Sequence, residues 1–219
     1  MRALLLCALL ASCAAVAGAP DQAAPFVQAP SPAAPSAPME TPAVPTGAYR
    51  LDRNHASVLF RIRHMDLAWF TGRFDTIEAT LELNGERPEL SKLNAQIGAA
   101  SVNSGVLADN GERRFDGVIA RALGAETSPQ ITFASTAIER TDATHARVTG
   151  DLTLNGQTHP ATLDVTFDGA RVDPLRGGAM VLGFSAYGTI DRTQWSVSDW
   201  RAFTGEIVQI VIEAELVKT

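Results

Sequence analysis

Alternation of apolar and polar residues with a period of two is the feature that most limits how this chain can fold. It begins near Tyr49, and in the next segment Val58, Phe60 and Ile62 fall on one face while Arg61 falls on the other. Successive side chains of a β-strand point to opposite faces of its sheet, so the pattern predicts strands with one apolar side. That apolar side must be covered by another layer or by closure of the sheet.

The same alternation recurs along the rest of the chain. Asn155-Gly156 is a strong signal for a two-residue hairpin, and the strand after it runs from 158 to 167. Together these patterns predict eight or nine short strands in an all-β domain. A sandwich and a barrel both satisfy the pattern. The other predicted strands lie at 69–74, 77–83, 93–99, 131–139, 148–154, 179–190 and 206–217.

One region lacks the alternation. Residues 104–123 are rich in Gly, Asp and Arg, and Phe115, Val118, Ile119 and Leu123 recur there at near-helical spacing. We therefore expect a short helical insertion in the β domain. The chain shows no internal repeat and no second hydrophobic unit.

The first part of the chain reads as an export leader and a tether. Residues 1–19 have a basic start and an apolar run too short to span a bilayer, which is typical of a signal peptide. Residues 20–46 hold eight of the 12 prolines, interleaved with Ala and Ser, and are expected to be a disordered linker. The folded domain is then 47–219, and the expected location is the periplasm.

Two alternatives are open for processing of the leader. Ala15-Val16-Ala17 fits cleavage before Gly18. Leu10-Ala11-Ser12-Cys13 resembles a lipobox, in which case Cys13 would be lipidated and would tether the domain to the envelope.

Charge and cysteine content exclude several classes of function. From residue 47 onward the chain has 17 basic and 22 acidic residues, so it lacks the basic surplus that nucleic-acid binding needs. Lys92 and Lys218 are its only lysines, which argues against a polybasic membrane patch. Both cysteines precede the domain, so disulfides, thiol catalysis and Cys-ligated zinc are not expected within it.

No pattern of catalytic residues stands out. The four histidines do not form a helical metal pair, and neither a phosphate-binding glycine loop nor a Gly-x-Ser-x-Gly elbow is present. Asp52 and His55 could share a rim, and an enzyme that uses this rim or the Asn110–Asp116 loop is an alternative. Because no convergent group of catalytic residues is visible, the interpretation that we favour has no catalytic residue, metal or cofactor.

The motifs along the domain resemble those of the YceI-like, polyisoprenoid-binding family. They include Tyr49-Arg-Leu-Asp52-x-x-His55 with Phe60 and His64, and they continue as Gly72-Arg-Phe74-Asp75, Ser101-Val-Asn103, Ser128-Pro129-Gln-Ile131-Thr-Phe133, Val148-Thr-Gly150-Asp-Leu152, Gly156-Gln-Thr-His159-Pro160 and Asp191-Arg192. The resemblance covers residues 48–217. It implies an elongated antiparallel eight-stranded lipocalin-like β-barrel.

The resemblance also implies a function. The barrel would hold an isoprenoid quinone or a similar long lipid in an apolar cavity, without catalysis, as a monomer or a homodimer. A structural envelope protein with a filled barrel is the other alternative. Residues 110–125 keep the polar part of the family pattern but lack its aromatic pair. The expected ligand-binding residues are Phe60, Ile62, Phe70, Phe74, Phe133, Phe184, Ala186, Tyr187 and Trp195, with Asn110, Arg113 and Asp116 as polar contacts.

Overall fold

The computed structural model of the protein describes residues 44–219, and the leader, Cys13 and most of the expected linker lie outside the described residues. The described part contains ten strands, one α-helix and four short 3₁₀ segments. The strands are β1 (Gly47–His64), β2 (Ala68–Phe74), β3 (Ile77–Leu83), β4 (Lys92–Gly98), β5 (Val102–Asn103), β6 (Gln130–Arg140), β7 (His145–Leu154), β8 (Gln157–Asp173), β9 (Ala179–Asp191) and β10 (Thr204–Lys218).

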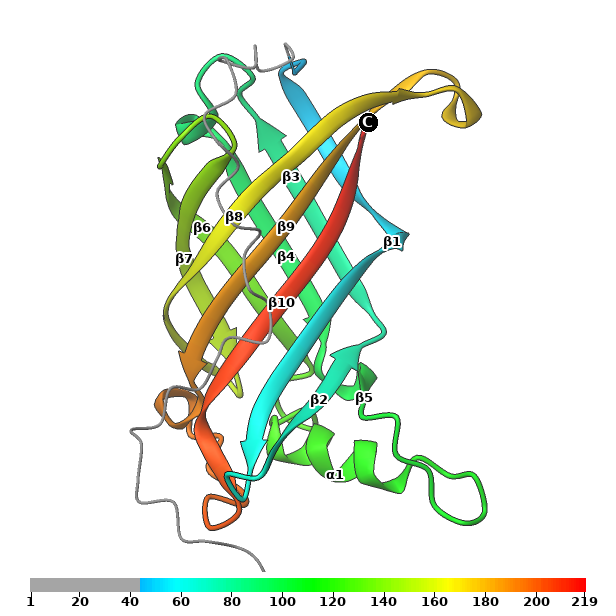
Figure 1. The fold of residues 1–219 in the computed structure, drawn as a ribbon, viewed down its shortest axis with the longest axis vertical. Coiled ribbons are helices and arrows are strands. Elements are labelled where there is room, and N and C mark those ends of the chain that lie inside the picture. Colours follow the sequence, from blue (N-terminus) through cyan, green and yellow to red (C-terminus); the bar gives the residue numbers. More distant parts are fainter. Residues whose placement is uncertain (1–43) are drawn as a thin grey trace, which may run out of the picture. The chain divides into compact units, whose positions relative to one another are not determined.

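The strands form one antiparallel sheet that closes on itself, because β1 pairs with β10. β2 pairs with the second half of β1 and β3 with its first half, so the two short strands occupy one place in the ring. β5 adds only a two-residue pairing to β2. The result is an eight-stranded barrel (Figure 1), which confirms the predicted fold class and excludes the sandwich.

Two irregular positions in the sheet have different origins, one in the local sequence and one in pairing between distant strands. Asn155 and Gly156 have φ angles of 50° and 72° between β7 and β8, which is the left-handed pair that a tight hairpin needs. In β1, four residues between Leu51 and Ala56 stand opposite one residue of β10, which makes a large irregular bulge. The predicted hairpin is confirmed, whereas the bulge follows from pairing with a distant strand.

The predicted helical insertion is confirmed as α1 (Arg114–Ala122), which lies across one end of the barrel (Figure 1). Ile119 and Ala120 are buried, and Val102 packs with them. The helix ends before Gly124, which has a φ of 74° as expected for a left-handed C-cap. No helix in residues 44–219 is long and apolar enough to cross a membrane.

Packed clusters of apolar residues lie toward the two ends of the barrel. The cluster at the α1 end includes Leu152, Leu154 and Trp195, the last from the 3₁₀ segment Arg192–Trp195. The cluster at the opposite end contains Tyr49, Leu81, Leu182 and Leu216.

The last residues of the expected linker contact the domain. Val44 packs with the cluster at the opposite end, the Pro45 carbonyl accepts a hydrogen bond from the Tyr49 hydroxyl at 2.6 Å, and the Thr46 carbonyl accepts one from Lys218 at 2.8 Å. The packed domain therefore begins a few residues before residue 47.

Candidate ligand cavity

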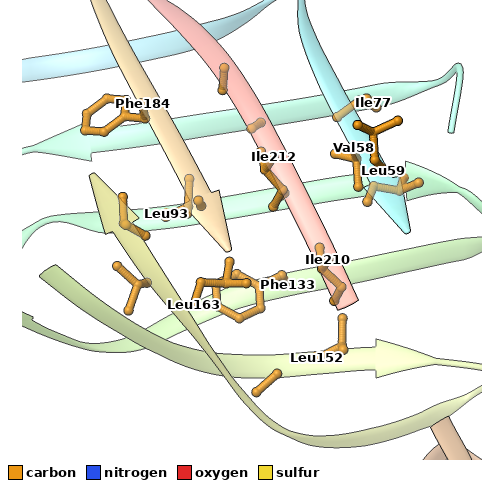
Figure 2. A pocket seen from close by; sticks show the side chains of 18 of the residues that line it. Val58, Leu59, Ile77, Leu93, Phe133, Leu152, Leu163, Phe184, Ile210 and Ile212 are labelled. Atoms are coloured by element: carbon orange, nitrogen blue, oxygen red, sulfur yellow. The ribbon is translucent and has the colours of Figure 1, made fainter. Parts of the chain in front are cut away.

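The barrel encloses a cavity of about 840 Å³. This volume lies within the range of about 300–1,000 Å³ that is usual for ligand pockets. Each of the eight strand positions in the barrel contributes apolar side chains to the wall of the cavity. Figure 2 shows one from each position, namely Val58, Ile77, Leu93, Phe133, Leu152, Leu163, Phe184 and Ile210.

The cavity differs between its middle and its ends. Members of both packed clusters line it, so it runs along the barrel between them. Its charged and histidine side chains, apart from Glu213, belong to the ends. They are His64 and Arg192 at the α1 end, and Glu86, Arg140 and His145 at the opposite end.

Two glycines allow phenylalanine rings to lie against the wall. Gly72 pairs with Phe60, and a Cβ atom at Gly72 would come within 2.4 Å of the Phe60 ring. A Cβ atom at Gly150 would come within 2.5 Å of the Phe133 ring. Because these positions carry no side chain, the rings reach over the neighbouring strand, which leaves space in the barrel.

Aromatic rings form a continuous path from the interior to the α1 end. Phe74 contacts Phe60 at 5.6 Å between ring centroids, and Phe60 contacts Phe70 at 6.3 Å. Phe70 meets Phe115 of α1 edge-on at 5.9 Å, and Phe115 contacts Trp200 at 6.4 Å. Such pairs add stability beyond the area that they bury. The path ends at side chains that are partly exposed, since Phe115 and Trp200 are 38% and 40% accessible.

Most of the apolar residues predicted to bind a ligand do line the cavity. They come from β1, β2, β6 and β9. They are Phe60, Ile62, Phe70, Phe74, Phe133, Phe184 and Ala186.

Two predicted residues do not line it. Tyr187 follows Ala186, so its side chain lies on the outer face of β9 and is 41% exposed. Trp195 is 1% exposed and packs in the cluster at the α1 end. Its indole nitrogen donates to the Leu152 carbonyl at 3.0 Å, and its ring meets His159 edge-on. Trp195 therefore fills the end of the barrel instead of facing the cavity.

The polar residues of the insertion also lie away from the cavity lining. Arg113 donates to the Asn103 side chain and to Asp116, while Asp116 accepts the Ser104 backbone N–H at 2.9 Å. Burial opposes ionisation of Asp116, but hydrogen bonds from Ser104 and the Arg113 charge outweigh it and lower the Asp116 pKa. This network ties α1 to β5 and so holds Phe115 over the barrel end.

Asn110 is separate from that network. Its side chain accepts the backbone N–H of Glu112 at 3.1 Å and shapes the exposed loop before α1. The structure thus brings Arg113 and Asp116 together and leaves Asn110 apart.

The Asp52–His55 pair lies at the β1 bulge and also outside the cavity lining. Oδ2 of Asp52 contacts His55 Nδ1 at 2.5 Å and is held by Arg176, which follows β8. Burial would raise the Asp52 pKa, but these two partners lower it to about 2. Asp52, His55 and Glu215 together form a group whose potential metal-ligand atoms lie within 4.8 Å of one another. Arg176 already engages the same Asp52 oxygen, so the arrangement is a latch between β1 and the β8–β9 hairpin.

The sequence reasoning missed Trp200 and Phe203, which line the cavity from the loop between β9 and β10. Arg192 holds this loop, because its guanidinium donates to the carbonyls of Val197 and Asp199 at 2.8 and 2.9 Å, and to Gly205 at 2.9 Å. The sequence did contain a signal for them, because Trp200 and Phe203 are aromatic residues that lie outside the strand pattern and follow the Asp191-Arg192 motif.

The fold and the cavity define a class, that of closed antiparallel barrels with an apolar interior suited to one small or elongated ligand. Comparison with known proteins gives the family. The model of the YceI-like domain matches residues 49–216, and the chain belongs to the YceI-like family.

Individual relatives agree with this assignment. The chain is 32% identical to the protein YceI of Escherichia coli O157:H7 over 169 residues, which is 76% of this chain and 85% of that protein. The crystal structure of Burkholderia cenocepacia BcnA is similar in fold, with a TM-score of 0.63, 23% identity, and coverage of 77% of this chain and 99% of that one. A polyisoprenoid binding domain from Saccharophagus degradans has a TM-score of 0.54 at 14% identity, covering 80% of this chain and all of that one.

Proposed function

We propose that this protein holds the chain of a polyisoprenoid, such as an isoprenoid quinone, in its barrel and carries it without chemical change. The observation that carries the proposal is the apolar cavity of about 840 Å³ that runs between the two packed ends. The description of the Saccharophagus degradans domain as polyisoprenoid-binding supports the choice of ligand class.

Burial of the chain supplies the binding energy. Removing one five-carbon unit from water contributes up to about 4 kcal/mol, at about 0.8 kcal/mol per carbon. Association and ordering of the chain oppose binding by about 4–15 kcal/mol. A few buried units therefore suffice, and the cavity needs no specific polar contact to retain the chain.

The polar ends of the cavity suit an amphiphilic ligand. His64 at one end and Glu86, Arg140 and His145 at the other can hydrogen-bond to a head group, whereas the middle offers apolar contacts. We propose that the isoprenoid chain of the ligand lies in the middle of the cavity and that its head group remains near one end of the cavity.

We propose that this function is carried out in the periplasm, because residues 1–19 have the pattern of an export leader and residues 20–46 that of a tether. Lipidation of Cys13 would keep the domain close to the membranes in which isoprenoid lipids reside. A Cys13→Ala variant should then become soluble in the periplasm, whereas a wild-type protein that is already soluble with Gly18 as its first residue would contradict lipidation.

The test of the carrier function is direct. Native protein is purified without added lipid, and its bound lipid is extracted and identified by mass spectrometry; delipidated protein is then titrated with a long-chain ubiquinone. An extracted isoprenoid and saturable binding with one site support the proposal. A protein that releases no lipid and binds no ubiquinone or polyprenyl phosphate would refute the carrier function and favour a structural role in the envelope.

A further inference from the structure

Large apolar side chains are exposed around the α1 end of the barrel. Met65 and Leu67 lie in the turn between β1 and β2, Phe115 lies on α1, and Trp200 and Phe203 lie in the loop between β9 and β10. Leu67 is 79% exposed, and Met65 and Phe203 are each 55% exposed. We call these five side chains the apolar rim.

Contacts between the three segments make the rim one surface. The Met65 backbone N–H donates to the Phe203 carbonyl at 2.7 Å, which joins the β1–β2 turn to the β9–β10 loop. The Phe115 and Trp200 rings, 6.4 Å apart, join that loop to α1. Both the turn and the loop adopt left-handed backbone conformations, with φ values of 51° at Met65 and 57° at Trp200. Such conformations are unfavourable for these residue types and persist only where surrounding contacts hold them.

The rim is continuous with the cavity. Phe115, Trp200 and Phe203 line the cavity and are also exposed, and the aromatic path from Phe74 ends at Phe115 and Trp200. Three of the side chains that line the cavity at the α1 end therefore also reach the surface, as expected for a mouth.

Several charged side chains around the rim are paired within the protein. Arg201 pairs with Glu206, Arg114 with Glu112 at 2.5 Å, and Arg113 with Asp116 at 3.3 Å. Arg63 donates to the Asp66 carbonyl within the turn. We therefore expect attraction to this surface to come from its apolar side chains more than from net charge.

We propose that the apolar rim inserts into the interfacial layer of a phospholipid bilayer, so that the ligand passes between bilayer and cavity without crossing water. The proposal rests on the proposed function, because a long isoprenoid chain resides in bilayers and is too costly to transfer through water. Exposed Trp, Phe, Leu and Met side chains are those that insert at membrane interfaces. A second copy of the chain bound to the same rim would cover the mouth and block exchange.

The test compares the rim with the opposite end of the barrel. All proteins are full-length and carry Cys13→Ala, so that an acyl anchor cannot contribute. The rim variant is Met65→Asn with Leu67→Asp, since neither side chain lines the cavity and Asn tolerates the left-handed backbone of Met65. The matched control is Leu175→Asp, which is 94% exposed and follows β8 at the other end.

Two measurements separate docking from ligand binding. Flotation with phosphatidylcholine vesicles measures docking, and titration with ubiquinone in detergent measures the cavity. We expect the rim variant to float about tenfold less than the control, because two apolar anchors are lost. It should take up ubiquinone from vesicles more slowly and still bind it normally from detergent. Flotation of the unaltered rim should persist in high salt, since apolar insertion is not screened by ions and several of the nearby charges are paired.

Three results would overturn the proposal: equal flotation of the rim variant and the control, flotation that requires anionic lipid, or a concentration-dependent dimer that only the rim variant loses. Vesicle flotation without ubiquinone binding from detergent would refute the proposed carrier function and leave the rim as a docking surface.

Discussion

The two ends of the barrel are closed in different ways. At the α1 end, inserted elements close the barrel. They are α1 and the β9–β10 loop with its segment Arg192–Trp195, and polar contacts hold both of them. At the opposite end, side chains of the strands themselves meet around Tyr49, and Arg176 latches the β8–β9 hairpin to β1. The difference shows that the strands build the interior, whereas the inserted elements close one of its ends.

The largest expected effect concerns the packing at the α1 end. Trp195→Ala removes the most buried large side chain of that end and its hydrogen bond to Leu152, so it should lower the free energy of unfolding by about 3–5 kcal/mol. Trp200→Ala, at the exposed rim of the same end, should lower it much less. Urea unfolding of both variants checks this, and equal losses would mean that Trp195 is not the anchor of this end.

The next prediction separates the interior from both ends. Ala186→Trp fills the cavity from β9, so ubiquinone binding should fall by more than about a hundredfold, or about 2.7 kcal/mol. Overpacking should lower stability by only about 1–3 kcal/mol, because the site borders empty space. Tyr187→Trp, one residue away on the outer face, should leave binding unchanged. A folded Ala186→Trp protein with wild-type affinity would contradict the assignment of the cavity.

A pH titration tests the latch at the opposite end. The pKa of Asp52 is about 2 in the folded protein against 3.8 for a free Asp, so the latch stabilises above about pH 4 and is lost as the pH falls toward 2. The contribution is about 2 kcal/mol at most. The difference in unfolding free energy between wild type and Asp52→Asn should be largest at neutral pH and shrink on acidification. A difference that does not change with pH would show that the Asp52 charge has no role.

His55 responds in the opposite direction. Hydrogen bonding to Asp52 raises the His55 pKa above 6.5, so its contribution is present at lower pH and is lost as the pH rises through the raised value. The free energy of unfolding should therefore differ less between pH 6 and pH 8 in the His55→Gln variant than in the wild-type protein.

The smallest effect is expected where the chain start meets the barrel. Tyr49→Phe keeps the buried ring and removes only the hydrogen bond to the Pro45 carbonyl, so it should cost about 0.5–1.5 kcal/mol. Tyr49→Ala, measured by the same urea unfolding, should cost several times more. If both variants lose the same amount, the hydrogen bond and not the ring stabilises this end.

Much of the fold could be predicted because its signal is local. Period-two alternation placed Val58, Phe60 and Ile62 on one face, which is the face that lines the cavity, and Asn155-Gly156 marked the β7–β8 hairpin. The same rule, applied strictly, places Tyr187 outside, where the structure has it. Trp195 could not be assigned this way because it lies in a 3₁₀ segment after the strand, where alternation carries no information.

The sequence by itself determined strands, inner faces and the helical insertion, since each depends on residues near one another in the chain. Only the tertiary structure decided which distant residues meet. Arg176 reaches Asp52 across 124 residues, and the Met65 turn meets the Phe203 loop because β1 pairs with β10. The latch and the apolar rim exist only after the barrel closes, because closure sets the register that brings these segments together.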